Sequence, residues 1–576
     1  MEPTLFKNMI NTLGTYRPRY LKGFVLLVIA NLLTITNPLI FRKAVMAMEV
    51  PGSTLAPWVI ALVAVAIMAS SMKFLMRLTF IIISRDIERD VRLKLFVKMQ
   101  KQSAAFYDKF GIGELLSRLT NDITAYRAVL GPGVMYPLFF LTLAVPGLIA
   151  LFFISPILAS FALIPLFIIP IVNGSARTFI YEYSMIVQEG LGKMSTMAQE
   201  YYSGIRAVKT YVIESSAYRR FQNLCKKLVG VQFRLLSIQG VIYPFFSLMT
   251  KLTTVGLVLL SGYIIYRAWG ELSTADFVSF MWIQSYIFQP ILMLGWLLPI
   301  YEKGRAAYDR LVDIYNEPIQ VLDRPDASLV IPENADIHIR NLTFTYPTVS
   351  RPTLRDINLH IPAGTIVGIT GPVGSGKTTL LRLLNREYEI PDGKISFSGH
   401  DIHEYHLDAF SNAMVTVEQI PFLFSKTIGE NIRFGKAEAT QEEVELVADY
   451  ADLHQTVLDF PEQYETLVGE RGVTLSGGQK QRVAMARAFL VERSILLLDD
   501  IFSAVDTATE RRIFSKLQNN FKGKTVLLIT HRVSILDQLQ RVVYMQDGRI
   551  VEDGSPAELK QKKGRYAALA ELQMMS

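Results

Sequence analysis

The chain has 576 residues, a length that predicts at least two structural units. Of these residues 50% are hydrophobic and 19% are charged, a composition that excludes disordered and collagen-like chains. The net charge is +7, but residues 1–300 carry an excess of 14 positive charges and residues 301–576 an excess of 7 negative charges. The positive charge therefore accompanies the apolar half of the chain, and we expect no nucleic-acid partner.

The first 305 residues contain six apolar stretches, each near or above the roughly 20 residues that cross a bilayer as a helix. Their limits are 22–46, 55–84, 133–154, 157–179, 236–266 and 275–302. The second, fifth and sixth exceed one crossing, which predicts helices that tilt or continue beyond the membrane.

The two longest connections between these stretches, 85–132 and 180–235, are rich in Lys and Arg. By the positive-inside tendency they lie in the cytoplasm together with the N-terminus. An even number of spans then returns the C-terminal half to the cytoplasm. The sequence thus predicts a multi-pass protein of the cytoplasmic (inner) membrane, surrounded by membrane lipid.

After the last span, residues 306–334 mix charges with three prolines, as a linker does. From about residue 335, short apolar strands alternate with polar helices, for example at 365–370, 495–498 and 526–529. This order predicts an α/β domain with a largely parallel sheet. We expect a transmembrane domain over 1–305, a linker over 306–334 and the α/β domain over 335–576.

The segment GPVGSGKT, residues 371–378, matches the phosphate-loop pattern GxxxxGK[ST] between the strand 365–370 and a helical stretch. Glycines let the backbone amides of such a loop converge on phosphate oxygens, and the helix start adds positive potential. Lys377 is expected to reach the outer phosphates and the Thr378 hydroxyl to bind Mg²⁺. The expected phosphate contacts are Gly371, Gly374, Ser375, Gly376, Lys377, Thr378 and Thr379.

Two carboxylates, Asp499 and Asp500, follow the apolar strand 495–498. Ligands of open α/β sheets collect at the carboxyl ends of the strands. We expect Asp499 to hold Mg²⁺ through water and Asp500 to face the terminal phosphate.

With the segment LSGGQ at 475–479, these motifs resemble an ATP-binding cassette (ABC) half-transporter of the exporter type, including bacterial multidrug exporters and lipid flippases. The resemblance covers essentially the whole chain. It implies a six-helix, all-α transmembrane domain followed by an α/β P-loop ATPase domain, with ATP and Mg²⁺ as cofactors. It also implies that two chains face head to tail, so that each ATP lies between the phosphate loop of one chain and the signature of the other. The signature contacts are Ser476, Gly477, Gly478 and Gln479.

The resemblance also assigns single residues and segments. Tyr346 corresponds to the aromatic residue that stacks on adenine, Gln419 to the glutamine that touches Mg²⁺, and His531 to the histidine that contacts the γ-phosphate. Short crosswise elements of the two basic loops should dock on nucleotide domains, and we place them near 113–122 and 209–215.

Asp500 departs from the family, which usually has glutamate there. Its side chain is one methylene shorter, and a misplacement near 1 Å can cost about a hundredfold in rate. We therefore expect slow hydrolysis, with Asp500, Gln419 and His531 as the catalytic residues. An intact signature beside Asp500 resembles one half of a heterodimeric multidrug exporter, and a heterodimer is favoured over a homodimer that tolerates Asp500.

Polar residues within the spans are the candidates for a substrate cavity, because charge inside a membrane helix is costly. They are Lys251 on the fifth span, Gln284 and Gln289 on the sixth, and Lys73 and Arg77 on the second. The alternatives are an interhelix role for Lys251 and snorkelling of Lys73 and Arg77 to the headgroups.

The expected function is ATP-driven transport, in the direction of export, of amphipathic small molecules, lipids or peptides. Two alternatives stay open. Some transporters of this architecture import siderophores, and a site that binds ATP but hardly turns over would suit an ATP-gated regulatory or channel subunit.

Overall fold

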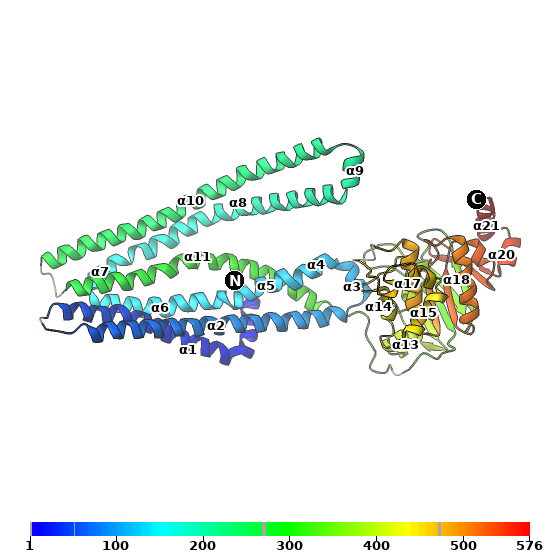
Figure 1. Cartoon of the computed structure of the whole chain (residues 1–576), viewed down its shortest axis with the longest axis horizontal. Coiled ribbons are helices and arrows are strands. Elements are labelled where there is room, and N and C mark those ends of the chain that lie inside the picture. Colours follow the sequence, from blue (N-terminus) through cyan, green and yellow to red (C-terminus); the bar gives the residue numbers. More distant parts are fainter. Residues whose placement is uncertain (1–2, 51, 268–271, 328, 470–473, 576) are drawn as a thin grey trace. The chain divides into compact units, whose positions relative to one another are not determined.

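The computed structural model describes residues 3–50, 52–267, 272–327, 329–469 and 474–575 (Figure 1). The chain divides into two compact units. One comprises residues 1–96 and 116–316, and the other comprises residues 97–115 and 317–576.

The first unit is built from helices, several of them much longer than a bilayer crossing requires. They are α1 (Pro3–Met48), α2 (Ala56–Gln100), the π-helical turn η1 (Arg118–Asp122), α5 (Ile123–Leu130), α6 (Pro132–Ile154), α7 (Pro156–Ala162), α8 (Ile164–Ser203), α9 (Ile205–Thr210), α10 (Glu214–Tyr266) and α11 (Thr274–Asn316). The last residues of α2 and the first four of α4 (Ile112–Ser117) are assigned to the second unit. The predicted excess length is confirmed for α2, α10 and α11, which have 45, 53 and 43 residues. In Figure 1, α8 and α10 run side by side.

Within the described residues, four stretches have the length and apolar composition of a membrane crossing. They are Gly14–Met48, Ala56–Gln100, Ile112–Ile154 and Pro244–Tyr266. The two other predicted spans, 157–179 and 275–302, fall in α7 with α8 and in α11. Because α11 continues to Asn316, residues 306–316 of the predicted linker are helical.

The predicted span 157–179 is divided between α7 and α8 at Leu163. Pro165 lies in the first turn of α8, where its missing N–H leaves no helical hydrogen bond unmade. Its ring also disfavours a helix that continues from the preceding residues. A local backbone effect thus interrupts a run that the apolar composition alone makes continuous.

The second unit contains two sheets and the helices around them. The strands are β1 (Ile337–Phe344), β2 (Leu354–Ile361), β3 (Ile366–Thr370), β4 (Ile395–Phe397), β5 (His400–Asp401), β6 (Met414–Val417), β7 (Ile495–Asp499), β8 (Thr525–Ile529), β9 (Arg541–Gln546) and β10 (Arg549–Gly554). A six-stranded sheet has the order β10-β9-β3-β8-β7-β6 and is parallel except for β10. The three predicted strands β3, β7 and β8 are confirmed, whereas the four-stranded antiparallel sheet, in the order β2-β1-β4-β5, was not foreseen.

The helices of the second unit connect and cover these strands. They are α3 (Ala104–Lys109), α12 (Lys377–Leu384), the 3-10 turn η2 (Ile402–Glu404), α13 (Leu407–Ala413), α14 (Ile428–Arg433), α15 (Gln441–Tyr450), α16 (His454–Leu458), the 3-10 turn η3 (Gln463–Glu465), α17 (Gly477–Leu490), α18 (Thr507–Asn520), α19 (Val533–Leu536), α20 (Pro556–Gln561) and α21 (Arg565–Met575).

The central strands β7 and β8 are buried along their whole length. Successive side chains of a strand point to opposite faces, so a strand covered on both faces is apolar throughout. In β7, Leu496 and Leu498 join the cluster that contains α15, α17 and α18, while Ile495 and Leu497 join the cluster that contains α12 and the β1–β2 pair. Asp499 continues the second series and therefore points toward α12.

Helix α3 packs on the second unit although it precedes most of the first unit in the chain. The backbone N–H of Ala104 donates to the carbonyl of Glu387 at 3.3 Å, and the Tyr388 hydroxyl donates to Asp108 at 2.5 Å. Ala105 is buried in the same cluster as β1 and β2. The sequence places a docking element near 113–122. This position is wrong for the contact observed here, because the side chains that pack on the strands of the second unit belong to residues 104–109.

Residues 116–122 instead belong to the first unit, where η1 is anchored to α11 by charged side chains. Arg310 donates to both carboxylate oxygens of Asp122, from Nε at 2.8 Å and from a terminal nitrogen at 2.6 Å. Arg118 donates to the carbonyl oxygen of Arg310 at 2.6 Å. Asp122 is buried, and paired two-point contacts of this kind are among the stronger hydrogen bonds.

We expect Asp122→Asn to destabilise the first unit by about 1–2 kcal/mol, because a neutral amide makes weaker hydrogen bonds to Arg310 than the buried carboxylate does. The loss stays modest because the half-exposed Arg310 regains part of its hydration. The measurement is the thermal unfolding midpoint of the full chain in lipid nanodiscs. Asp313→Asn, at an exposed position of α11, is the matched control and should leave the midpoint unchanged. Equal midpoints for the two variants would contradict an anchoring role for Asp122.

Candidate nucleotide-binding site

The phosphate loop joins β3 to α12 and has room only for glycine at two of its positions. Gly371 and Gly376 have φ angles of 139° and 98°. A Cβ atom on Gly371 would lie 1.9 Å from the carbonyl oxygen of Met545, and one on Gly376 would lie 2.5 Å from Leu354. The loop is thus pressed against β9 and β2, which fixes the path of its backbone.

Lys377, the first residue of α12, folds its side chain back over this loop. Its ammonium donates to the carbonyl oxygens of Gly371 and Pro372 at 2.8 and 2.9 Å, and to the Ser375 hydroxyl at 3.3 Å. Burial lowers the pKa of Lys377 from its ordinary value, although the neighbouring carboxylates oppose this. A phosphate would replace these neutral acceptors with charged ones, which form stronger hydrogen bonds.

Asp499 lies at the buried end of β7 and shares a hydrogen bond with Thr378. Burial raises the pKa of the Asp499 carboxyl, and the negative charge of Asp500 adds to the shift, while Thr378 and Lys377 oppose it. A carboxylate and a hydroxyl are the oxygen ligands that Mg²⁺ prefers. The donor set therefore fits the expected cation.

Asp500 follows in the left-handed backbone region, with φ 46°, which aspartate tolerates better than most residues. Its backbone N–H donates to the carbonyl of Ile529 at 2.9 Å, which ties the turn to the end of β8. Gln419 donates from Nε2 to Oδ2 of Asp500 at 3.1 Å. The turn thus aims the Asp500 carboxylate toward Gln419.

His531 comes two residues after β8 and faces the same space. Burial lowers the pKa of its imidazole from the ordinary value, and the positive charge of Lys377 adds to the effect. The carbonyl oxygen of His531 accepts a hydrogen bond from Gln573 of α21 at 2.6 Å. The C-terminal helix thus braces the histidine, which the resemblance did not indicate.

One pocket of about 190 Å³ collects the predicted phosphate and catalytic residues from separate segments, except Gly371, which does not line it. It is lined by Thr353, Val373, Gly374, Ser375, Gly376, Lys377, Thr378, Thr379, Gln419, Asp499, Asp500, Ile529 and His531. Thr353, Val373 and Ile529 were missed as site residues by the sequence reasoning. Thr353 reaches the pocket through the pairing of β2 with β1, which no local pattern reveals.

Tyr346 lies just after β1, beside this pocket. Its hydroxyl and that of Thr379 are 3.0 Å apart, and its ring packs edge-on against Phe344 and Tyr388 with centroids 5.1 Å away in each case. The ring is half-buried. The remaining exposed part suits a flat ligand next to the phosphate loop.

The signature residues form the start of α17 and, within the described residues, do not line this pocket. Gln479 donates its backbone N–H to the Ser476 hydroxyl at 3.3 Å, and its side-chain oxygen accepts from the backbone N–H of Ser476 at 2.8 Å. This reciprocal cap stabilises the helix end. A Cβ atom on Gly478 would lie 2.6 Å from the carbonyl oxygen of Ala504, and Gly477 also borders Ala504.

Gln481, one turn into α17, was not identified from the sequence. Its Nε2 donates to the carbonyl of Gln419 at 3.2 Å and to the Ser503 hydroxyl at 2.8 Å, and its Oε1 accepts from the backbone N–H of Ala504 at 3.2 Å. One buried side chain thus joins the signature helix, the Gln419 segment and the loop after Asp500. A polar residue on the buried side of α17 was the signal available.

The candidates for a substrate cavity are dispersed in the first unit. Lys251 and Arg77 are exposed, and Lys73 is half-buried. Gln284 is buried against apolar side chains of α6, α7 and α11, beside a void of about 10 Å³. The side chain of Gln289 lies outside the described residues. Lys251 does not line the void beside Gln284, so the substrate assignment stays a prediction.

Comparisons with known proteins agree with this organisation. Residues 20–291 match the family of ABC transporter transmembrane regions, and residues 354–503 match the ABC transporter family. The multidrug resistance-like ATP-binding protein MdlA of Escherichia coli (strain K12) is 31% identical over 565 residues, which cover 97% of this chain and 94% of the relative. The ATP-dependent lipid A-core flippase of Syntrophus aciditrophicus (strain SB) is 30% identical over 576 residues, which cover 99% and 94%.

The structural comparison extends over both units. A bacterial Atm1-family ABC exporter, solved with ATP bound, superposes with a TM-score of 0.79 at 25% identity, covering 97% of this chain and 98% of that one. Relatives and fold therefore agree along the whole length. The chain belongs to the ABC transporter family, with a helical membrane-spanning region followed by an ATP-binding domain of the transport-ATPase type.

Proposed function

We propose that this chain is one subunit of a dimeric, ATP-driven exporter of the cytoplasmic (inner) membrane, with its N-terminus and ATP-binding domain in the cytoplasm. The observation that carries the proposal is the pocket in which the phosphate loop meets Asp499, Asp500, Gln419 and His531. The basic connections 85–132 and 180–235 support the orientation.

In this proposal the buried groups of the pocket match the charges of ATP and Mg²⁺. Lys377 and the loop amides bind the phosphates, and Thr378, Asp499 and Gln419 hold the cation, which supplies charge neutralisation on the phosphate oxygens. Tyr346 contacts the adenine. Burial works against the charged forms of both Lys377 and Asp499, so a ligand of opposite charge to each relieves that cost.

A second chain completes the site. ABC exporters act as dimers, and the signature segment 476–479 is absent from the described lining of its own chain's pocket. Ser476 and the amides of Gly477 and Gly478 would then contact the nucleotide bound by the partner. A capped helix start with exposed N–H groups suits that role.

We assign Asp500 and His531 to the hydrolytic step. Asp500 orients the attacking water, assisted by Gln419, and the neutral imidazole of His531 donates a hydrogen bond to the terminal phosphate. The shorter side chain of Asp500 slows this chain's own site. The heterodimer proposal follows from it, since a partner with glutamate would supply the faster site, completed by the signature of this chain.

For the substrate we propose an amphipathic molecule, either a small compound or a lipid. The names of the relatives, multidrug resistance-like protein and lipid A-core flippase, support this class. The partly exposed aromatic residues Phe245, Trp282 and Tyr286 of α10 and α11 offer apolar surface for such ligands, whereas Phe246 is buried in the core of this unit.

Replacing Lys377 by Met should abolish ATP-dependent transport, because the phosphates lose their charged partner inside the loop and the two chains no longer close over ATP in this pocket. The measurement is uptake of a fluorescent amphipathic compound or lipid into inside-out vesicles, together with ATP hydrolysis, which should fall by about a hundredfold or more. Lys522→Met, at an exposed position of the same unit, is the control and should behave as the wild type. Transport that continues in the Lys377 variant would refute the proposed function.

Replacing Asp500 by Glu should speed hydrolysis at this chain's own site by up to about a hundredfold if one methylene limits the rate, and the total rate of a complex with a faster partner site should about double. Asp500→Asn keeps the size of the side chain and removes the base, so it should abolish the residual activity of this site. An unchanged rate in the Asp500→Glu complex would show that the shorter side chain is not rate-limiting.

The lowered pKa of His531 predicts how the site responds to acid. The ordinary pKa of histidine is 6.5, and because the pKa of His531 is lower, its imidazole is still mostly neutral at pH 6.5. The rate advantage of the wild type over His531→Gln should therefore persist at pH 6.5 and shrink only at lower pH. The measurement is the ratio of the two ATPase rates between about pH 5 and pH 7.5. A ratio that already falls above pH 6.5 would contradict a neutral histidine at the phosphate.

A further inference from the structure

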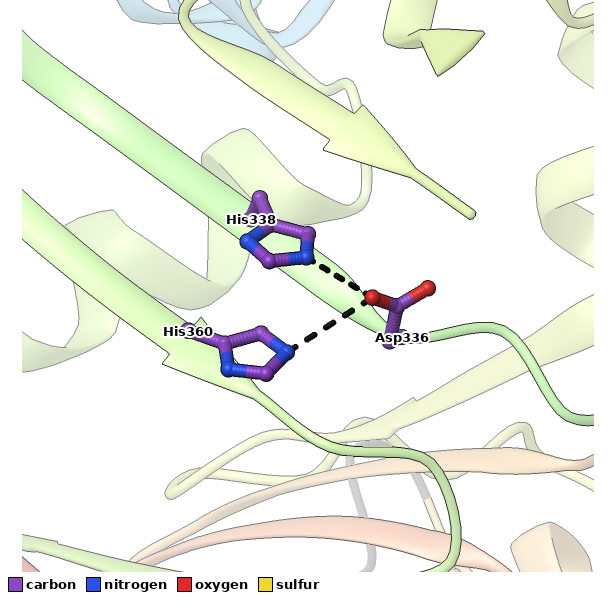
Figure 2. A group of neighbouring side chains, drawn as sticks. All are labelled: Asp336, His338 and His360. Atoms are coloured by element: carbon purple, nitrogen blue, oxygen red, sulfur yellow. Dashed lines mark hydrogen bonds and ion pairs between the residues drawn. The ribbon is translucent and has the colours of Figure 1, made fainter. Parts of the chain in front are cut away.

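Three side chains away from the nucleotide pocket gather on the antiparallel sheet of the second unit (Figure 2). His338 on β1 and His360 on β2 are direct partners in the antiparallel register. Opposed residues of such a pair project from the same face of the sheet. Their rings lie parallel, with centroids 4.0 Å apart and planes 7° apart.

The Nε2 atoms of both histidines converge on one carboxylate oxygen. Oδ2 of Asp336 is 2.7 Å from Nε2 of His338 and 3.6 Å from Nε2 of His360. In a tetrahedral site with bonds of about 2.0–2.1 Å, neighbouring ligand atoms are about 3.3 Å apart. The two observed distances lie on either side of this value. A metal ion lies in the plane of each imidazole that binds it, so the two stacked rings must also turn toward each other to share one cation.

The surroundings of the cluster favour a cation and leave it accessible. Asp336, His338 and His360 are 37%, 30% and 49% exposed, so water can complete the coordination. Arg541, which donates to the carbonyl oxygen of His360 at 2.6 Å, is neutralised by Asp553.

A second group of similar composition shows what a structural histidine looks like in this unit. His403 is buried, and its Nδ1 is 2.6 Å from Asp401 while its Nε2 is 3.1 Å from Glu389. Asp401 also caps the turn η2. Both ring nitrogens of His403 are therefore engaged within the fold, whereas His338 and His360 direct the same ring atom into one shared, solvent-accessible position.

We propose that Asp336, His338 and His360 form a binding site for one divalent transition-metal ion. Two imidazoles and one carboxylate are the ligand set of Zn²⁺, Ni²⁺ and Cu²⁺, while Mg²⁺ prefers oxygen ligands. The site is thus chemically distinct from the oxygen ligands at Thr378 and Asp499. It does not depend on the proposed transport function.

A metal at this position would fasten the open end of the β1–β2 pair. The opposite end of the same pair leads to Tyr346, just after β1, and to Thr353, just before β2, and Thr353 lines the nucleotide pocket. A ligand that binds the folded pair and not the unfolded chain stabilises the fold. Metal binding should therefore raise the unfolding temperature of the ATP-binding unit.

The test uses the full-length protein in nanodiscs, without a polyhistidine tag, after removal of metals by a chelator. Zn²⁺ is titrated against a chromophoric chelator in the presence of excess Mg²⁺, and thermal unfolding is recorded with and without Zn²⁺. We expect one Zn²⁺ per chain at this site and a rise in the unfolding temperature. His338→Gln and His360→Gln should each weaken binding by at least about a hundredfold, since loss even of a residue that only supports a ligand costs tenfold to a hundredfold.

Three controls separate the site from other possibilities. His406→Gln removes an exposed histidine outside the cluster and should leave Zn²⁺ affinity unchanged. Asp499→Asn should also leave it unchanged, which distinguishes the site from the nucleotide pocket. Cu²⁺ bound to the wild type should show two nitrogen ligands by electron paramagnetic resonance. The proposal would be overturned if His338→Gln, shown to be folded without metal, bound Zn²⁺ as tightly as the wild type. Loss of Zn²⁺ binding in Asp499→Asn would also overturn it.

Discussion

The nucleotide pocket depends on the double burial of strand β7. Its alternate side chains enter two different hydrophobic clusters, so a slip by one residue would exchange the side chains of the two faces, disturb the packing of both clusters and turn Asp499 away from α12. This register fixes Asp499 on the side of α12 and places Asp500 in the turn that follows. The position of two charged groups is thus determined by the packing of four apolar ones.

The electrostatics of the pocket follow from the same burial. Lys377, Asp499 and His531 all lie where water is partly excluded, and desolvation moves the pKa of each toward its neutral form. Such an arrangement costs stability in the absence of a ligand and favours ligands that bring compensating charge. A polyanion together with a divalent cation satisfies the basic and the acidic groups at once.

The features that the sequence predicted correctly are those determined locally. The strands β3, β7 and β8 are continuous apolar runs next to recognisable loops, and the long helices follow from apolar length alone.

Features that arise from tertiary contacts escaped prediction. Thr353 reaches the pocket through strand pairing, and Gln481 acts through three hydrogen bonds to segments remote in sequence. The docking element was misplaced because burial of α3 depends on the surface formed by Glu387 and Tyr388, which the basic loop itself does not reveal. The predicted substrate cavity that would contain Lys251 and Gln284 remains a prediction, because neither the local sequence pattern nor a single chain defines its lining.

The single amide of Gln481 couples three segments that meet different parts of the nucleotide machinery. If the Gln419 segment moves without the other two, a buried hydrogen bond is lost, and each such loss costs on the order of 1–3 kcal/mol. The free energy that favours one arrangement of the pocket therefore also favours one arrangement of the signature helix. If nucleotide in the pocket changes the affinity of the signature helix for a binding partner by some factor, thermodynamic reciprocity requires that this partner change the affinity of the pocket for nucleotide by the same factor.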